Sequence, residues 1–244
     1  MSKVIVITGA GVGLGRALAR RFAREGETIV ALGRTASKVE AVADELGGSA
    51  MGIGCDVSQP DSVRAAFARI AERHPKIDVL INNAAIFQPF TVAAATDKQI
   101  LDPILTNLAG GVFCARAAIP MMERGGYIIN VSSESAGMLY PHLSLYQASK
   151  AGLERFGESL YHELAPQGIR VTNVRAGTMY EDGKAWDVDP AAAMAFAQAT
   201  AAVGLNLREQ PIAHFDSVTH IFRALLDTPP DLHAVTVNLH SRRP

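Results

Sequence analysis

Segments with the composition of a β-strand alternate with segments that have the periodicity of an α-helix along most of the chain. Residues 4–8 are rich in β-branched side chains, and residues 14–24 place Leu18, Ala19 and Phe22 on one helical face. The sequence predicts further strands at residues 28–32, 51–57, 77–81, 126–131, 169–174 and 235–239. Strand followed by helix, repeated, predicts a parallel sheet covered by helices on both faces.

Two capping-box patterns mark the starts of predicted helices. Ser37 with Glu40 opens a helix toward residue 46, and Thr96 with Gln99 opens a long helix that reaches about residue 122. Pro103 must lie in the first turns of that long helix or kink it. A third long helix is predicted over residues 143–164.

The length of the chain and the handedness of crossovers define the expected architecture. The 244 residues suffice for one large domain, and right-handed crossovers favour a doubly wound sheet. We therefore predict a single α/β domain over residues 1–244: a Rossmann-type doubly wound parallel sheet of about seven strands in a three-layer α/β/α arrangement. The alternation is interrupted at about residues 177–211. Because ligands bind at the carboxyl ends of such strands, we interpret this insertion as a substrate lid.

Composition excludes several classes of partner. The formal net charge is −1, so no strong field favours nucleic acid or an anionic membrane. No apolar run approaches the length of a membrane span, and the amino terminus does not resemble a secretory signal. Only Cys55 and Cys114 are present, which fits a reducing cytoplasm. The histidines show no paired ligand spacing, so we predict no metal.

A glycine-rich turn follows the first predicted strand and opens the first helix. Gly9, Gly11, Gly13 and Gly15, with Leu14, supply backbone amides that can approach a pyrophosphate. The positive end of the helix dipole adds a favourable field for that anion. In a strand–turn–helix context this pattern predicts dinucleotide binding.

The residue after the second predicted strand indicates which dinucleotide binds. A carboxylate there would accept hydrogen bonds from a ribose and repel a 2′-phosphate, but this chain has Arg34. A guanidinium is suited to phosphate, which favours NADP(H) over NAD(H). The alternative is that Arg34 only caps a helix or faces water.

Polar residues after the third and fourth strands extend the predicted nucleotide site. Asp56, with Val57 beside it, follows the third strand and can accept a hydrogen bond from the adenine amino group. Asn83 and Ala84 follow the fourth strand and can line the sugar. Each of these residues is also compatible with ordinary turn chemistry.

Tyr146 and Lys150 lie four residues apart in the predicted helix 143–164, so their side chains share one face. A cation beside a phenol favours the phenolate and lowers a pKa that starts near 10. A tyrosine of that kind can exchange a proton with an alcohol near neutral pH. Taken alone, the spacing also occurs in helices with no catalytic role.

At this point the chain resembles the short-chain dehydrogenase/reductase family over essentially its whole length. The resemblance rests on five motifs: Thr8-Gly9 with Gly13 and Gly15, Asn82-Asn83-Ala84-Ala85, Thr106-Asn107-Leu108, Asn130-Val131-Ser132-Ser133, and Tyr146 with Lys150. It implies an NADP(H)-dependent oxidoreductase that interconverts a carbonyl and a secondary alcohol by hydride transfer. The implied catalytic residues are Asn107, Ser133, Tyr146 and Lys150.

The resemblance also implies a role for each catalytic residue. Ser133 polarises the substrate carbonyl, and Tyr146 exchanges the proton. Lys150 lowers the pKa of Tyr146 and binds the nicotinamide ribose, and Asn107 holds a water that links Lys150 to solvent. Family members commonly pair through two long helices, which implies a homodimer or homotetramer.

The chain departs from the family pattern after the sixth strand. Ala176-Gly177 replaces Pro-Gly, and Glu181 stands where a threonine often contacts the nicotinamide carboxamide. We expect Gly177 and Thr178 to take part in cofactor binding by a shifted loop.

The substrate side is less constrained by the sequence. Aromatic and methionine residues at loops can form an apolar wall: Phe87, Phe90, Met138, Tyr140, Met179, Tyr180 and Trp186. Glu134 either meets a polar substrate group or is solvated. Two rival functions stay open: a non-catalytic NADP(H)-binding regulator and an NAD-linked alcohol dehydrogenase.

Overall fold

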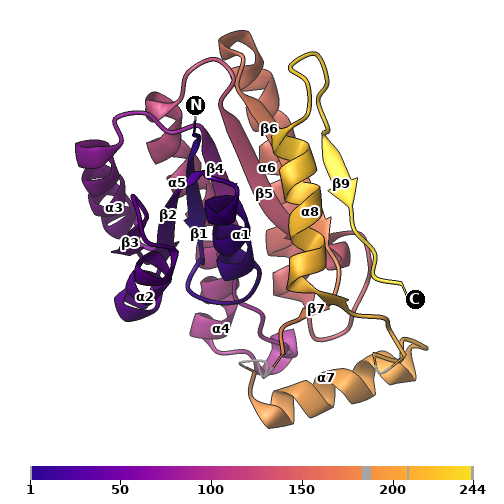
Figure 1. Ribbon diagram of the computed structural model, residues 1–244. Helices are drawn as coiled ribbons and strands as arrows, with labels where there is room; N and C mark the ends of the chain where they lie inside the picture. Colours follow the sequence, from indigo (N-terminus) through magenta and orange to yellow (C-terminus); the bar gives the residue numbers. More distant parts are fainter. Residues whose placement is uncertain (1, 183–187, 208, 243–244) are drawn as a thin grey trace.

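A seven-stranded parallel sheet forms the centre of the molecule in the computed structural model, which describes residues 2–182, 188–207 and 209–242 (Figure 1). The strand order is β3-β2-β1-β4-β5-β6-β9. The strands are β1 (Val4–Thr8), β2 (Thr28–Gly33), β3 (Met51–Gly54), β4 (Val79–Asn82), β5 (Tyr127–Ser133), β6 (Arg170–Ala176) and β9 (Thr236–Asn238). The predicted doubly wound fold is confirmed.

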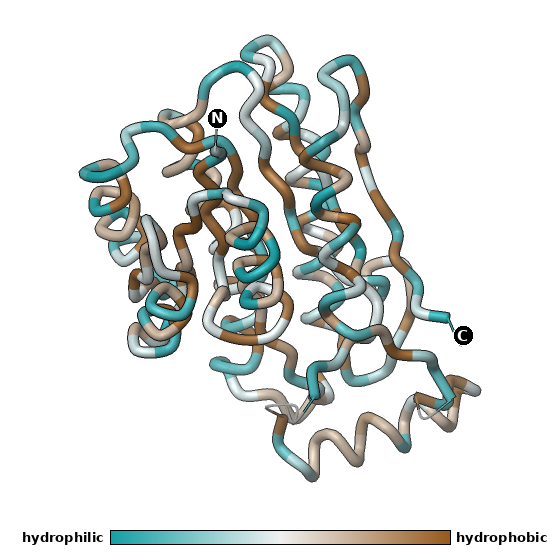
Figure 2. The backbone as a smooth tube through the Cα atoms, in the orientation of Figure 1, coloured by the Kyte–Doolittle hydropathy of each residue, from teal (hydrophilic) through white to brown (hydrophobic). Residues whose placement is uncertain are grey.

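Helices cover both faces of this sheet. One face packs against α1 (Gly13–Arg24), α2 (Ala36–Leu46) and α8 (Phe215–Leu226). The other packs against α3 (Pro60–Arg73), α5 (Gly110–Ala118) and α6 (Ser144–Leu164). Successive residues of β1 alternate between the two cores, with Ile5 and Ile7 in one and Val6 in the other. Figure 2 shows the strands as the brown, apolar interior of the molecule.

Most predicted elements have the expected positions, and the differences lie at their ends. The capping box of Thr96 and Gln99 is confirmed at the start of α4 (Asp97–Pro103). The one predicted at Ser37 and Glu40 is wrong, because α2 begins at Ala36 and its N-cap is Thr35. The third strand is shorter than predicted and ends at Gly54.

A π-helical segment interrupts the long helix predicted after Thr96. It spans Ile104–Ala109, directly after Pro103, and lies between α4 and α5. Such segments occur often at functional sites, and this one carries Asn107. Contrary to the expectation from sequence, the stretch Asp97–Met121 is long and apolar enough, by length and composition alone, to cross a membrane. In the structure its parts contact α3, β4 and α6.

The region after β6 departs from the regular alternation. It contains the short strands β7 (Met179–Tyr180) and β8 (Ala213–His214), which pair with each other, and α7 (Pro190–Ala202). In Figure 1, α7 lies across the carboxyl end of the sheet. The lid predicted at about residues 177–211 stays a prediction, and residues 183–187 and 208 lie outside the described residues.

Three asparagines form a buried ladder across the middle of the sheet. Asn82, Asn130 and Asn173 are register partners on β4, β5 and β6. The Asn82 amide donates to Asn130 Oδ1 at 3.0 Å, and the Asn130 amide donates to Asn173 Oδ1 at 3.2 Å. The Asn173 amide then donates to the backbone carbonyl of Glu154 at 3.0 Å. The ladder therefore fixes α6 against the strands whose ends form the site.

Candidate active site at the carboxyl edge of the sheet

The strand order reverses its direction between β1 and β4, which are neighbours in the sheet. In an open parallel sheet the crevice at such a switch point is the expected ligand site. The glycine-rich turn follows β1, and Asn83 and Ala84 follow β4. The structure therefore brings these two predicted segments together at one edge.

The glycine-rich turn has a backbone that other residues adopt with strain. Gly9 and Gly13 have φ values of 66° and 57°. A Cβ atom on Gly15 would lie 2.4 Å from the carbonyl oxygen of Gly9, so a side chain there is excluded. Gly11 lies against Lys38, whose Cβ is 3.1 Å from the place of an added Cβ. The side chain of Leu14 is buried in the core, so Leu14 can offer a ligand only its backbone.

The turn also leaves the start of α1 free for an anion. Val12, the N-cap residue, makes no side-chain capping bond, and the first turn of α1 has no acidic residue. The amides of a helix start need acceptors, and a phosphate provides them. The residues present therefore fit the pyrophosphate of a dinucleotide.

Asn83 and Thr8 hold the turn in place. Thr8 Oγ1 accepts from the backbone amides of Asn83 and Ala84, each at 2.9 Å. The Asn83 amide donates to the carbonyl of Thr8 at 2.9 Å. The Asn83 side chain thus helps to hold the glycine-rich turn in its conformation.

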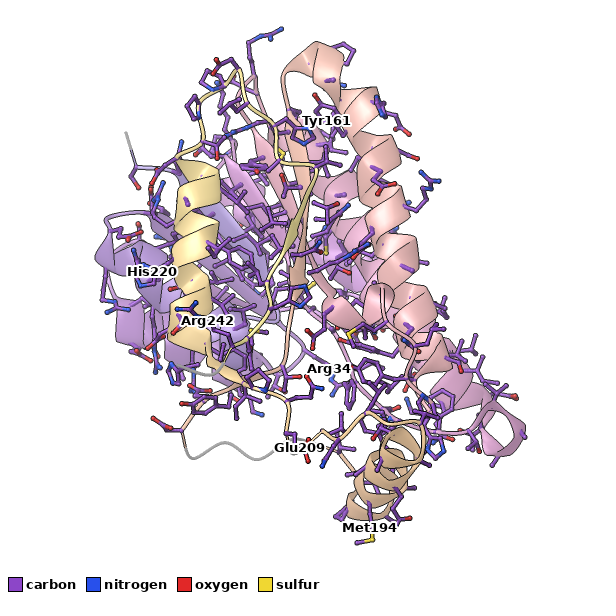
Figure 3. The ribbon with its side chains drawn as sticks, turned by 90° about the vertical axis from the view of Figure 1, so that its right-hand side faces the viewer. Arg34, Tyr161, Met194, Glu209, His220 and Arg242 are labelled. Atoms are coloured by element: carbon purple, nitrogen blue, oxygen red, sulfur yellow. The ribbon has the colours of Figure 1, made fainter. Side chains whose placement is uncertain are left out.

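The adenosine side carries exposed cations. Arg34 follows β2 and is exposed, and Figure 3 draws it at the end of the molecule where α7 lies. Lys38, also exposed, lies in the first turn of α2. Asp56 Oδ1 accepts from the backbone amide and hydroxyl of Ser58 at 3.0 and 2.7 Å. Val57 is buried in the core, so its side chain is not available to a ligand.

Three consecutive residues at the end of β5 form hydrogen bonds with side chains of α6. The Lys150 ammonium donates to the carbonyl of Val131 at 2.7 Å. The Ser132 hydroxyl donates to Glu154 Oε1 at 2.5 Å. Ser133 forms a hydrogen bond with Tyr146. The structure therefore brings Ser133, Tyr146 and Lys150 together, from a strand end and one face of a helix.

The pKa values in this cluster differ from the expectation from sequence. Burial raises the pKa of the Tyr146 phenol, while the hydrogen bond with Ser133 acts to lower it and the charge of Glu134 to raise it. Burial also lowers the pKa of Lys150 to about 8. In the structure the hydrogen bond with Ser133 is therefore the contact that favours the ionised phenol.

Asn107 joins the loop after β4 to α6. Its Oδ1 accepts from the backbone amide of Ile86 at 2.8 Å, and its amide donates to the carbonyl of Ile86 at 3.0 Å and to Ser149 Oγ at 3.1 Å. Asn107 is buried. Its side chain is thus occupied by protein groups and positions the loop beside the catalytic helix.

Aromatic side chains lie beside Tyr146. The ring of Phe87 packs edge-on against Tyr146 with centroids 5.1 Å apart, and against Phe196 of α7 at 5.9 Å. Tyr140 lies 6.3 Å from Phe196. Helix α7 is therefore held beside Tyr146 by aromatic contacts, while Met194 on the same helix points away from the sheet (Figure 3). Trp186 lies outside the described residues.

The segment after β6 has its own contacts. Glu181 forms an ion pair of 2.5 Å with Arg16 of α1. The carbonyl of Thr178 accepts from the amide of Ala213 at 3.1 Å, and a Cβ on Gly177 would lie 3.0 Å from the carbonyl of Leu239. Glu134 lies 3.5 Å from His240 as an ion pair when the histidine is protonated. Thr178 is thus held by its backbone, next to the lid.

Sequence reasoning did not find four charged residues near this edge: Arg16, Lys38, Glu154 and Arg175. Lys38 could have been found, because it stands at the start of the helix that was predicted from Ser37. The partners of Arg16 and Arg175 lie 165 and 21 residues away, so no local pattern indicates them. Within residues 2–182, 188–207 and 209–242, no group of three His, Cys, Asp or Glu side chains is arranged to hold a metal ion.

Comparison with known proteins gives a consistent result. Residues 3–186 match the family described as short chain dehydrogenase. The chain is 38% identical over 172 residues to a 3beta-hydroxysteroid dehydrogenase of Mediterraneibacter gnavus, a match that covers 68% of this chain and 62% of that protein. It is 31% identical over 228 residues to carbonyl reductase family member 4 of Danio rerio, covering 93% of this chain and 90% of that protein.

A solved structure shares the fold. It is a short chain dehydrogenase from Burkholderia cenocepacia in complex with NADP, with a TM-score of 0.82 at 26% identity. The superposition covers 98% of this chain and 96% of that chain.

Proposed function

Since the chain belongs to the short-chain dehydrogenase/reductase family, we propose that it interconverts a carbonyl and a secondary alcohol with NADP(H) as the hydride carrier. The observation that carries this proposal is the meeting of Ser133, Tyr146 and Lys150 at the end of β5. A hydroxyl, a phenol and an ammonium in one cluster are suited to proton transfer to a carbonyl oxygen.

Each residue of the cluster has a proposed role. Ser133 donates a hydrogen bond to the carbonyl oxygen and stabilises the negative charge that develops there. The bound nicotinamide supplies the hydride in reduction and accepts it in oxidation. Tyr146 gives its proton to the alkoxide, which leaves an alcohol, and takes the proton back in the reverse direction. Lys150 stabilises the phenolate, and Asn107 keeps the loop after β4 against α6.

We propose that NADP(H) is preferred over NAD(H). The uncapped start of α1 accepts the pyrophosphate, and Arg34, with Lys38 in the first turn of α2, offers positive charge for a 2′-phosphate. The side chain of Asp56 remains a candidate for the adenine amino group, and Gly177 and Thr178 for the nicotinamide side. The Burkholderia cenocepacia structure, which contains NADP, supports this choice.

The aromatic contacts beside Tyr146 favour an apolar substrate. Phe87, Tyr140 and Phe196 present ring faces and edges to the space beside the phenol. Aromatic walls bind flat or aliphatic rings better than small charged molecules. We therefore propose a bulky apolar carbonyl or alcohol as substrate; the hydroxysteroid dehydrogenase relative is consistent with this class.

The test is a panel of carbonyls read by cofactor absorbance, run with NADPH and with NADH. It includes a steroid ketone, a small aliphatic ketone and a charged 3-oxo acid. We expect NADPH to be oxidised fastest with the steroid ketone. NADPH binding without turnover across the panel would favour the non-catalytic regulator, and preference for NADH would favour the NAD-linked alcohol dehydrogenase.

We also propose an assembly and a location for the protein. It forms a homodimer or homotetramer in the cytoplasm, through the two long helical segments that carry Asn107 and Tyr146. Leu101 on α4 is 53% exposed, as expected for a side chain that a second copy covers. Sedimentation analysis that finds only monomer would contradict this assembly.

A further inference from the structure

Glu154 is a buried carboxylate for which the proposed reaction has no use. It lies on α6, one helical turn after Lys150, and is 5% exposed. Arg175 of β6 donates to both of its oxygens, from Nε at 2.8 Å and from Nη2 at 2.7 Å. The Ser132 hydroxyl donates to Oε1. The carboxylate is therefore fully hydrogen-bonded inside the protein.

A buried network of this kind adds little to the stability of the fold by itself. Removing two charges from water costs several kcal/mol per ion, and a buried pair often does no more than offset that cost. Arg175 is partly exposed, with 31% of its side chain accessible, whereas the Glu154 side chain is 7% accessible. The buried partner is therefore Glu154, which lies on the helix that carries Lys150 and is bonded to β5. Its charge can act on other groups in this buried region.

Glu154 and Lys150 are bonded to neighbouring residues of β5. Lys150 bonds to Val131 and Glu154 to Ser132, which are consecutive residues of β5. The asparagine ladder fixes the backbone of α6 at Glu154 itself. The ammonium and the carboxylate are therefore held on the same strand end and one turn apart on the same helix.

The charge of Glu154 acts on Lys150. Burial disfavours the ammonium, and Glu154 is the neighbouring charge that acts against this effect. The other charged or titratable groups around this cluster are Tyr146 on α6, Glu134 in the turn after β5 and Arg175 on β6. Glu158 lies farther along α6 and acts on Arg175. Arg175 is bonded to Glu154, and Glu134 acts on Tyr146.

We propose that Glu154 is a positioning residue for Lys150: held by Ser132 and Arg175, its carboxylate keeps the buried ammonium charged and fixed against β5. This inference rests on the proposed function only for its consequence in catalysis. Its electrostatic part concerns the protein alone and is tested without turnover.

The test follows the Lys150 side chain by NMR of isotope-labelled lysine during a pH titration. The Lys150 signal is the one that Lys150→Met removes. In Glu154→Gln we expect the midpoint of Lys150 to fall by about one pH unit or more, because burial then acts on the ammonium without a nearby opposite charge. Glu158→Gln, the same change one turn farther along α6 at a partly exposed site, should leave the midpoint unchanged.

A second variant keeps the proposal testable if Glu154→Gln does not fold. Arg175→Gln removes a positive charge and leaves the carboxylate in place, so we expect the midpoint of Lys150 to rise. An unchanged midpoint in a folded Glu154→Gln protein, or a fall in Arg175→Gln, would overturn the proposal and leave the proposed function intact.

Catalysis supplies the second readout. We expect the turnover of Glu154→Gln, relative to the unmodified protein, to recover as the pH is lowered, because acid restores the proton to Lys150. A turnover deficit that is the same at every pH indicates a merely structural role and contradicts the proposal. Full turnover of Lys150→Met would instead contradict the proposed function.

Discussion

Arg34 is the side chain on which the proposed cofactor preference depends. It is exposed at the end of β2 and is free to meet a phosphate from solvent. Arg34→Asp removes the positive charge and places a carboxylate where a 2′-phosphate is expected. We predict that the KM for NADPH rises by about 10- to 100-fold, as for the loss of one or two charge-assisted hydrogen bonds, while the KM for NADH falls or is unchanged.

The matched control for this prediction is Arg69→Asp. Arg69 is an exposed arginine of α3, so the variant makes the same charge change elsewhere on the surface. Steady-state kinetics with both cofactors measure the effect. Equal losses for NADPH and NADH in Arg34→Asp would show that Arg34 does not read the 2′-phosphate.

Ser133 has two effects that one substitution separates. It is proposed to stabilise the developing oxyanion, and its hydrogen bond acts to lower the pKa of Tyr146. In Ser133→Ala we predict a fall in kcat of about 10²- to 10³-fold. The phenol should also ionise at higher pH, so the acid limb of the oxidation profile moves to higher pH.

A pH–rate profile of alcohol oxidation measures both effects, with Ser144→Ala as a control at the exposed start of α6. If the acid limb of Ser133→Ala moves to lower pH, the hydrogen bond between Ser133 and Tyr146 does not act as described.

At the scale of single residues, the sequence predicts where a residue lies within its helix or strand better than which residues it contacts in the fold. Tyr146 and Lys150 could be paired from sequence because helical periodicity places residues four apart on one face. The bond from Lys150 to Val131 and the contacts of Glu154 could not, because they depend on how β5 docks against α6. The effect of Lys150 on the pKa of Tyr146 that the spacing predicts stays a prediction for the same reason.

At the scale of elements, the close contact between α6 and the sheet depends on one glycine. A Cβ on Gly157 would lie 2.4 Å from Asn173 Oδ1 and 2.6 Å from Asn130 Nδ2. Both amides belong to the buried ladder and have no room to move. We predict that Gly157→Ala lowers the free energy of unfolding by about 1–3 kcal/mol, although alanine is the better helix former.

Urea denaturation measures this loss, and Gly152→Ala is its control on the same helix. There the added Cβ would meet only the side chain of Leu108, with Cδ2 at 3.1 Å. The end of a leucine side chain can shift, so the loss should be much smaller. A Gly157→Ala protein as stable as the parent would mean that α6 and the ladder are not in close contact.

The elements that sequence reasoning placed well are those with a regular pattern. β1 and β5 carry runs of buried aliphatic residues. The two-residue strands β7 and β8 are too short to show any period. Helix α8 was missed, although Val218, Phe222 and Leu225 form an apolar stripe that could have indicated it.

At the scale of the whole molecule, buried cysteines make folding sensitive to alkaline pH. Burial raises the pKa of Cys55 from 9.0 to about 11. Above pH 9 the unfolded chain therefore loses a proton that the folded chain keeps, so the contribution of Cys55 to stability falls as the pH rises toward 11. Lys150, whose pKa is lowered to about 8, acts in the opposite direction above that pH.

A comparison of the parent with a Cys55 variant removes the contribution of Lys150 to the pH dependence of stability, because both proteins keep Lys150. We predict that the difference in unfolding free energy between the parent and Cys55→Ala narrows by on the order of 2 kcal/mol across the pH range in which the unfolded thiol ionises. Urea midpoints at a series of pH values measure it. A difference that stays constant would show that the Cys55 thiol ionises equally in both states.

The architecture of the whole molecule follows from the alternation of strands and helices, except in the region after β6. Alternating strand and helix patterns predict the doubly wound sheet, because each crossover must be right-handed and must cover a face. The lid region could be located but not described, since an alanine-rich helix such as α7 has no distinct apolar face. In Figure 2 it is nearly uniform in colour, and its position depends on contacts such as that of Phe196 with Phe87.

The most direct test of proton transfer at the end of β5 is turnover by Tyr146→Phe, measured beside NADPH binding by fluorescence titration. We predict that turnover of a carbonyl substrate falls by about 10²- to 10⁴-fold, the usual share of a general acid. The dissociation constant for NADPH should stay within a small factor of the parent value, because the ring and the nucleotide turn are retained. Turnover close to that of the parent would contradict the role of Tyr146, and with it the proposed mechanism.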